Sequence, residues 1–352
     1  MRRWVAVLGF SLIACSQTPS SPIAGATASP APSATPSPQP SPTPAADLAL
    51  AKVDFSCRLP VAISTAASAA PYENGFVSFP SGVVTIDPAG KGGAYFDRVF
   101  SRWLPVARDA VSPDGAHYAS VDLGDPGVFN VHVVDVRTGR DHVLREKGSG
   151  FSFQPFVFDY ASEGIYIGQG FERIQPGLWL VAPTTGAMRQ VSKVGGLQVS
   201  AGRGVFWSGE INRADPNPIQ VPSSAGTLPD QVDRLDLKSG TKAVWWYQPG
   251  KGVRIVALDI HGHPLIRVYF ATPPVPPKTD PIDHSATELL VALDSKTQRS
   301  IYKGQLVESL GGTISDTHGV WFGSPQGIYL YSDTRGLLKV SDLPGGPANG
   351  CF

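Results

Sequence analysis

The chain has 352 residues, its 29 Lys and Arg balance 29 Asp and Glu, and only 16% of it is charged. Soluble domains typically carry about 25% charged residues, and nucleic-acid binders show a basic face or tail, so the composition argues against a nucleic-acid ligand and against a highly charged disordered chain. The 38 Gly and 33 Pro, beside 42% hydrophobic residues, predict many turns, few long helices and an all-β core.

The first residues resemble a bacterial lipoprotein signal. Two arginines precede an apolar run from Trp4 to Ile13, which is too short to span a bilayer as a helix. The following Leu12-Ile13-Ala14-Cys15 is similar to a lipobox. This resemblance implies that residues 1–14 are removed and that the Cys15 thiol carries a diacylglycerol, which would anchor the protein on the outer face of a membrane. The alternative is an ordinary secretory signal with an incidental Cys.

Residues 15–47 read as a tether. From residue 16 to residue 46 the chain has nine Pro and no charged residue. Such a segment cannot bury a core and favours solvated polyproline II, so we expect it to be disordered and to hold a folded domain, residues 48–352, away from the membrane. A proline-rich ligand for a partner is the alternative, although no basic anchor accompanies the prolines.

Cys57 and Cys351 stand at the two ends of the folded region. An oxidising extracytoplasmic compartment makes a disulfide between them plausible, and two buried free thiols are the alternative. A bridge requires the two chain ends to meet, as they do in a closed ring.

Two turns recur along residues 57–352. The first is an apolar strand end followed by a Gly turn, as in Val111-Ser112-Pro113-Asp114-Gly115. The second is Val134-Asp135-Val136-Arg137-Thr138-Gly139, with a copy at Leu235-Asp236-Leu237-Lys238-Ser239-Gly240. Asp suits such turns because its carboxylate accepts from nearby backbone N–H groups, and Gly accepts positive φ. Each unit is therefore predicted to be a four-stranded antiparallel meander of about 50 residues.

A single meander cannot bury both of its faces, so the units must pack radially. This predicts an all-β fold, a six-bladed β-propeller of four-stranded antiparallel blades. The predicted blades are residues 57–105, 106–149, 150–194, 195–250, 251–304 and 305–352.

The two turns in the unit of residues 106–149 resemble the WD40-like repeats of six-bladed TolB-type propellers. The last unit, with Asp316-Thr317-His318-Gly319-Val320-Trp321-Phe322-Gly323, is similar to the repeat of sensor and lyase propellers. The resemblance implies a propeller throughout residues 57–352, but its motifs specify turns rather than chemistry. The chain lacks the second α/β domain of TolB, so the TolB partnership is not carried over.

The loops between the second and third strands of each unit project from the face opposite the two Gly-containing turns, and five of them are long. Long loops gathered on one face indicate a binding face, and prolines within them lower the cost of ordering; drift at unconstrained loop tips is the alternative. The candidate binding residues on these loops are Glu172, Arg173, Glu210, Arg213, Asp215, Asp280, Asp283 and His284.

Motifs that carry chemistry are missing from the sequence. It has no Gly-x-Ser-x-Gly elbow, P-loop, His-Glu-x-x-His or zinc-spaced Cys pair, so the sequence assigns no catalytic residue, and we predict no cofactor or metal site. His261-Gly262-His263 has a metal-like spacing but no obvious acidic companion, and we interpret it as a turn. Trp245-Trp246-Tyr247 could stack on sugars, but strand alternation favours packing between blades.

These patterns predict a lipid-anchored, monomeric, non-catalytic platform in the bacterial cell envelope that binds a protein, peptide or glycan. The alternative is an extracytoplasmic hydrolase, lyase or lactonase with a site near the propeller axis. Clustered carboxylates or a cation near the axis on the loop face would favour the enzyme, and an apolar or hydroxyl-lined axis would favour binding.

Overall fold

The computed structural model describes residues 48–352 except 64–72, 122–129, 145–154, 170–176, 194–198, 203, 213, 221–227 and 273–280. The signal and the whole tether, Cys15 included, lie outside the described residues. Residues Ala45–Phe352 form one compact unit. Among the described residues, no helix has the length and apolar character that a bilayer crossing needs.

Three successive segments form four-stranded antiparallel sheets, each with its strands in chain order, as the repeat predicts. Their strands are β9 (Pro155–Ala161), β10 (Gly164–Gln169), β11 (Leu178–Val181) and β12 (Met188–Ser192); β13 (Val199–Gly202), β14 (Val205–Glu210), β15 (Gln231–Asp236) and β16 (Lys242–Tyr247); and β17 (Lys251–Leu258), β18 (Pro264–Phe270), β19 (Glu288–Ala292) and β20 (Gln298–Lys303).

The two chain ends share one eight-stranded sheet. It consists of β1 (Cys57–Ile63), β2 (Glu73–Phe79), β3 (Val83–Ile86), β21 (Gly311–Asp316), β22 (Gly319–Ser324), β23 (Gly327–Ser332), β24 (Gly336–Ser341) and β25 (Gly345–Pro347). The C-terminal β25 pairs antiparallel with β1 and also meets β22, so it joins the last strands to the first. This pairing closes the ring with backbone hydrogen bonds.

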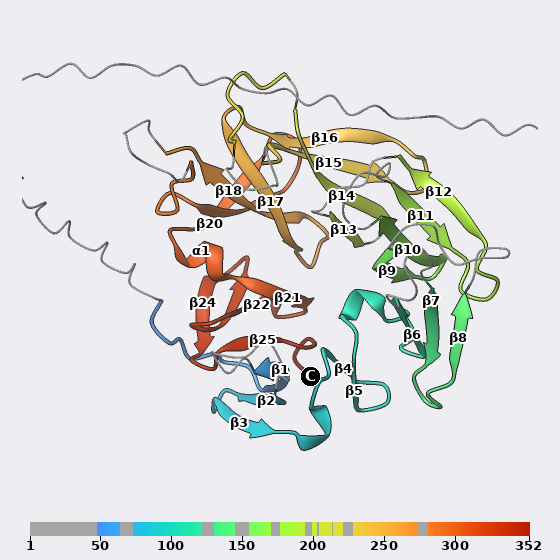
Figure 1. Cartoon of the computed structure of the whole chain (residues 1–352). Coiled ribbons are helices and arrows are strands. Elements are labelled where there is room, and N and C mark those ends of the chain that lie inside the picture. The colour runs from blue at the N-terminus through green and yellow to red at the C-terminus, as the bar shows by residue number, and fades with distance from the viewer. Residues whose placement is uncertain are drawn as a thin grey trace, which may run out of the picture. The chain divides into compact units, whose positions relative to one another are not determined.

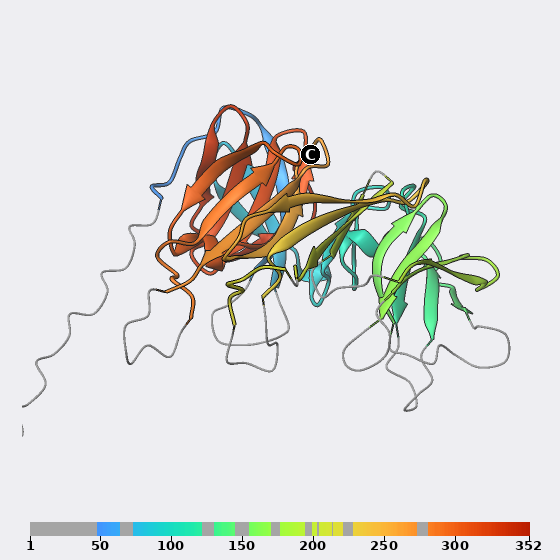
Figure 2. The same ribbon diagram turned by 90° about the horizontal axis from the view of Figure 1, so that it is seen from above.

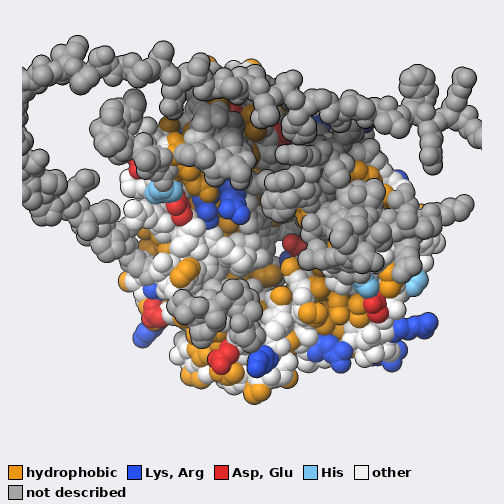
Figure 3. Space-filling model, viewed as in Figure 1, with side chains coloured by type: hydrophobic (Ala, Val, Ile, Leu, Met, Phe, Trp, Pro, Cys, Tyr) orange, Lys and Arg blue, Asp and Glu red, His pale blue; other side chains and the backbone are white. Residues whose placement is uncertain are grey.

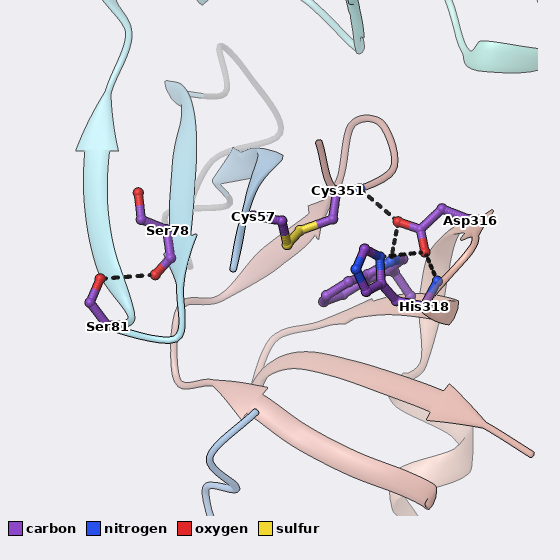
Figure 4. Close-up of a disulfide and its surroundings, with 7 residues drawn as sticks. Cys57, Ser78, Ser81, Asp316, His318 and Cys351 are labelled. Atoms are coloured by element: carbon purple, nitrogen blue, oxygen red, sulfur yellow. Dashed lines mark hydrogen bonds and ion pairs between the residues drawn. A yellow bond between two sulfur atoms is a disulfide. The ribbon is translucent and has the colours of Figure 1, made fainter. Parts of the chain in front are cut away.

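The predicted disulfide is confirmed and covers the same junction. Cys57 and Cys351 are bonded, with their Cα atoms 5.6 Å apart. Beside them, the Asp316 carboxylate accepts from the Cys351 N–H at 2.6 Å and from the Trp321 Nε1–H at 2.8 Å, and Cys351 and Asp316 lie next to each other in Figure 4. A covalent bond, a strand pair and a half-buried carboxylate therefore hold the two ends together.

The first two predicted blades are less regular than the others. Residues 106–149 form a three-stranded sheet, extended by an isolated bridge from Val111 to Tyr118. Before it, a separate two-stranded hairpin does not extend β3, because Asp87 and Pro88 end that strand in a short 3-10 helix and Pro cannot donate to a ladder. These elements are β4 (Tyr95–Asp97), β5 (Arg102–Leu104), β6 (His117–Val121), β7 (Val131–Asp135), β8 (Asp141–Leu144) and the 3-10 helices η1 (Pro88–Gly90) and η2 (Arg108–Ala110). The described α-helix, α1 (Leu306–Ser309), lies between β20 and β21.

The core lies between neighbouring sheets rather than within one layer. Leu178 of β11 packs in a cluster with Phe206 of β14, and Trp207 of β14 packs in another with Val268 of β18. Similar clusters join β6–β7 to β10, β18–β19 to β22–β23, and β1–β2 to β22–β24. In Figures 1 and 2 the β13–β16 sheet accordingly lies between the β17–β20 sheet and the β9–β12 sheet.

This radial packing of antiparallel sheets is that of a β-propeller. The predicted all-β fold and its four-stranded antiparallel sheets are therefore confirmed, while the count of six blades stays a prediction.

The predicted Asp/Gly turns form as expected. Asp135, Asp236 and Asp294 each accept a hydrogen bond from the main-chain N–H three residues further on, at 2.6, 2.7 and 2.8 Å. Gly139 and Gly240 take φ of 72° in the first two of these turns, a conformation that a Cβ would strain. The sequence repeat thus fixes where each outer hairpin turns.

Candidate functional site

A cavity of about 1470 Å³ lies among the first strands of the sheets. We call it the axial cavity, and Figure 3 looks toward the hollow near the centre of the ring, where acidic side-chain atoms are visible in its depth. Every part of the ring contributes to its wall; representative lining residues are Asp97 of β4, Asp109 of η2, Asp159 of β9, Gly204 before β14, Ala257 of β17, Asp316 of β21 and Phe352 at the C-terminus.

The axial cavity extends to the ends of the sheets that carry the short Gly turns. Residues Ser162, Gly262 and Thr317, each from a turn between the first and second strands of a sheet, belong to its lining, as does Pro113 from the turn between the Val111 bridge and β6. Sequence analysis places the candidate binding residues on the opposite face. The cavity lining includes none of those candidates that fall among the described residues.

Four of the eight predicted binding residues, Glu172, Arg173, Arg213 and Asp280, lie outside the described residues. The other four are engaged locally. The Glu210 carboxylate lies 3.8 Å from Lys242 Nζ, and burial raises its pKa. Asp215 accepts from the N–H groups of Asn217 and Gly250, at 2.8 and 2.9 Å.

Asp283 and His284 lie within the long connection between β18 and β19. The Asp283 carboxylate accepts from the Ser285 hydroxyl at 2.6 Å, and His284 Nδ1 lies 2.5 Å from Glu308 Oε1. These contacts stabilise the loops, and the role of the loops in binding stays a prediction.

Two carboxylates in the axial cavity stand apart from the rest. The carboxylates of Asp109 and Asp159 make no hydrogen bond or ion pair with any residue in the described part of the chain. The surrounding cavity walls partly desolvate Asp109 and raise its pKa, although the residue as a whole is exposed. Burial also raises the pKa of Asp159, and the negative charges of Asp109 and Glu163 raise it further, to about 7, against the opposing effect of Arg108.

The other carboxylates of the cavity wall have structural roles. Asp97 accepts from the Phe100 N–H at 2.8 Å, and Asp259 accepts from the His263 N–H at 2.7 Å. Glu163 accepts from the Tyr166 hydroxyl at 2.8 Å, and Asp316 secures the ring closure. Asp109 and Asp159 are therefore the described cavity carboxylates that have no hydrogen-bond partner.

The mouth of the axial cavity has exposed apolar side chains. Val99, Ile260 and Phe352 line it and are 64%, 37% and 44% exposed. The Phe352 ring stacks on the Phe96 ring with an interplanar angle of 8°. The Arg98 guanidinium lies over the Phe352 ring, 5.4 Å from its centroid. These contacts fix one apolar wall of the mouth in place.

The His261-Gly262-His263 turn has the acidic companion that sequence analysis did not find. Asp259 accepts from the N–H groups of His261 and His263, and its Oδ2 lies 3.0 Å from His263 Nδ1. The carboxylate shapes this turn, as an Asp in an Asx turn does. Nowhere in the described ranges do three His, Cys, Asp or Glu side chains come together as a metal site would need.

Trp245 and Trp246 join neighbouring sheets. The Trp246 ring is buried and its Nε1–H donates to Gln298 of β20, while the Trp245 Nε1–H donates to the Ala292 carbonyl of β19. The packing interpretation of this pair is therefore supported by contacts between blades.

No family model matches the chain, and no curated protein matches it. Among solved structures it is similar to TolB from Acinetobacter baumannii, with 15% identity, a TM-score of 0.42, and coverage of 85% of this chain and 68% of that one. The propeller domain of the trilobed protease from Pyrococcus furiosus has 12% identity, a TM-score of 0.41 and coverage of 84% of each chain. The tricorn protease has 13% identity and a TM-score of 0.42, and the match covers 82% of this chain but only 27% of that one.

Asp109 and Asp159 are not among the residues that the sequence patterns predicted to bind. Asp159 interrupts the apolar run Phe156-Val157-Phe158-Asp159-Tyr160 two residues before a Gly turn. A charged residue inside the first, innermost strand of a predicted blade points to the axis of a propeller, and this was the available signal.

The titration of Asp159 predicts that stability falls as pH rises from about 4 to about 7. The unfolded chain releases this proton near pH 3.8, whereas the folded protein holds it to about pH 7. Between these values ionisation stabilises the unfolded state relative to the folded state. Asp159→Asn should match the wild type at pH 4. At pH 8 it should be more stable by about 1–2 kcal/mol, because cavity water screens the larger value that the pKa difference alone implies.

Urea unfolding at the two pH values measures this difference. Asp294→Asn is the matched control, because the amide keeps the oxygen that accepts the turn hydrogen bonds while one exposed negative charge is lost. An Asp159→Asn protein no more stable than the wild type at pH 8 would contradict the assignment.

Proposed function

We propose that the protein is a non-catalytic binding protein, anchored on the outer face of a bacterial membrane, and that its ligand enters the axial cavity. The cavity carries this proposal. Its volume of about 1470 Å³ exceeds the 300–1,000 Å³ of typical small-molecule pockets, so it has room for part of a larger molecule. A protein segment, peptide or glycan fits this size better than a small cofactor does.

The sequence supports the membrane location. The lipobox-like segment ending at Cys15 supplies a lipid attachment site, and the proline-rich residues 16–46 supply reach. The Cys57–Cys351 disulfide suits an oxidising compartment outside the cytoplasm.

Site-specific photo-cross-linking in intact cells tests where the ligand binds. The photoreactive residue replaces Thr317 at the cavity, Asp283 near the long-loop face, or Ser295 in an exposed turn remote from the cavity lining. We expect a discrete adduct from position 317 and none from position 295. An adduct from position 283 alone would move binding to the long-loop face, and no adduct from position 317 would overturn the proposal.

The carboxylates near the axis favour a second function, that of a hydrolase. Asp109 and Asp159 share the cavity, and the raised pKa of Asp159 is near the value that a general acid or base needs at neutral pH. Turnover of glycoside or ester substrates that Asp159→Asn abolishes and Asp294→Asn retains would establish the enzyme. Turnover that both variants retain would exclude Asp159 from catalysis.

A further inference from the structure

The axial cavity holds more negative than positive side chains, and two of its carboxylates have no hydrogen-bond partner among the described residues. Asp97, Asp259 and Asp316 hold main-chain N–H groups, which leaves the Asp109 and Asp159 carboxylates facing the open space. Of the two arginines in the lining, Arg98 lies beside the Phe352 ring at the mouth. Only Arg108 partly offsets the two carboxylates, so the interior has an excess of negative charge.

This excess has a physical cost that a ligand can remove. Two carboxylates in a confined space disfavour each other's ionisation, and burial adds to the penalty. A cation placed between them would regain Coulomb energy and supply the hydrogen-bond donors that both groups lack among the described residues. Ammonium and guanidinium groups provide several donors each, whereas the described residues offer no third ligand to hold a metal ion there.

The apolar side chains at the cavity mouth indicate which groups of the ligand should flank its cation. Val99, Ile260 and Phe352 are exposed apolar side chains, and all three line the same cavity. The Phe352 ring is held by Phe96, which packs edge-on against Phe76, so this wall is ordered before a ligand arrives. A rigid apolar wall favours apolar groups on either side of a charged one.

We infer that the axial cavity selects an ammonium or guanidinium group carried on an apolar chain, the chemistry of a lysine or arginine between apolar residues of an extended peptide. The cation lies at Asp109 and Asp159, and the apolar groups contact Val99, Ile260 and Phe352. This inference rests on the proposed function, because it names the class of ligand that enters the same cavity.

Two capped peptides test the selection. One has lysine between leucine and phenylalanine, and the other has norleucine in place of lysine. At pH 8 and low salt, calorimetry should show the lysine peptide binding wild-type protein about tenfold or more tighter than the norleucine peptide. Equal affinity for the two peptides, or no saturable binding of the lysine peptide, would overturn the inference.

Charge-removing variants assign the effect to the two carboxylates. Asp109→Asn and Asp159→Asn should each weaken the lysine peptide about fivefold to tenfold and leave the norleucine peptide unchanged, whereas Asp294→Asn should change neither. Loss of affinity in Asp159→Asn does not reflect unfolding, because this variant is expected to be the more stable at pH 8. If all three variants bind the lysine peptide like the wild type, the carboxylates do not select the ligand.

The source of the cation is resolved by a third probe, hexylamine. Hexylamine that displaces the lysine peptide at equal concentration would support the inference with a free amine as the ligand, and a much tighter peptide would support it with a peptide. A cross-link from position 317 without any lysine preference would refute this inference and leave the proposed function intact. A lysine preference without that cross-link would support cation selection by the cavity and refute the proposal that the cellular ligand enters it.

Discussion

Cys351→Ser is expected to lower the free energy of unfolding by about 3–5 kcal/mol. The bond joins residues separated by 294 positions, so its loss restores a large conformational freedom to the unfolded chain. The folded state should persist, since Arg58 and Phe352 still exchange two main-chain hydrogen bonds, at 2.8 and 3.1 Å. Urea unfolding of the oxidised wild type and the variant measures the difference.

Cys57→Ser and the double variant provide the control for this prediction. Both should lose as much stability as Cys351→Ser, and a reductant should destabilise only the wild type. Equal unfolding midpoints for wild type and variants would contradict the role of the disulfide in closing the ring. Because Phe352 follows Cys351 and lines the cavity mouth, loss of the bond should also loosen that wall.

Asp316→Ala is expected to cost about 2–4 kcal/mol. The carboxylate accepts from the main-chain N–H groups of Cys351 and His318 and from the Trp321 Nε1–H. The alanine would leave these donors without their acceptor beside a Trp321 ring that is 0% exposed, and unsatisfied buried donors are costly. The free energy of unfolding from urea titrations measures the loss.

Asp294→Ala is the matched control, because Asp294 also accepts from two main-chain N–H groups but lies in an exposed turn. It should lose no more than about 1 kcal/mol, since water replaces the acceptor. Asp316→Asn should fall between the two. If Asp316→Ala costs no more than Asp294→Ala, the carboxylate does not stabilise the closure.

Local turn chemistry made most of the fold predictable. The Asp135 and Asp236 turns depend on contacts within four residues, and such contacts are legible in sequence. The strand that closes the ring is different. Gly345-Gly346-Pro347 has none of the β-branched or aromatic residues typical of strands, and it becomes β25 only because β1 and β22 lie beside it.

The candidate site was less predictable for a related reason. Loop length pointed to the face of Asp283 and His284, but loop length carries no information about the space between innermost strands. Asp109 and Asp159 lie 50 positions apart in the sequence and share a cavity only after the ring has closed. Asp109 lies outside the recurring turns, and Asp159 lies in one copy of the first turn at a position for which the repeat specifies no charge, so the repeat could not single them out.

The titration of the Asp159 carboxyl group is the most direct test of cation binding in the axial cavity. Carbon-13 NMR of aspartate carboxyl groups would follow it in free protein and in protein saturated with the lysine peptide, with Asp159→Asn identifying the resonance. We predict a pKa of about 7 in the free protein, raised by burial, Asp109 and Glu163, and a clear fall when the peptide binds. A carboxyl group that titrates near 3.8 in the free protein, or whose titration the peptide leaves unchanged, would contradict the account.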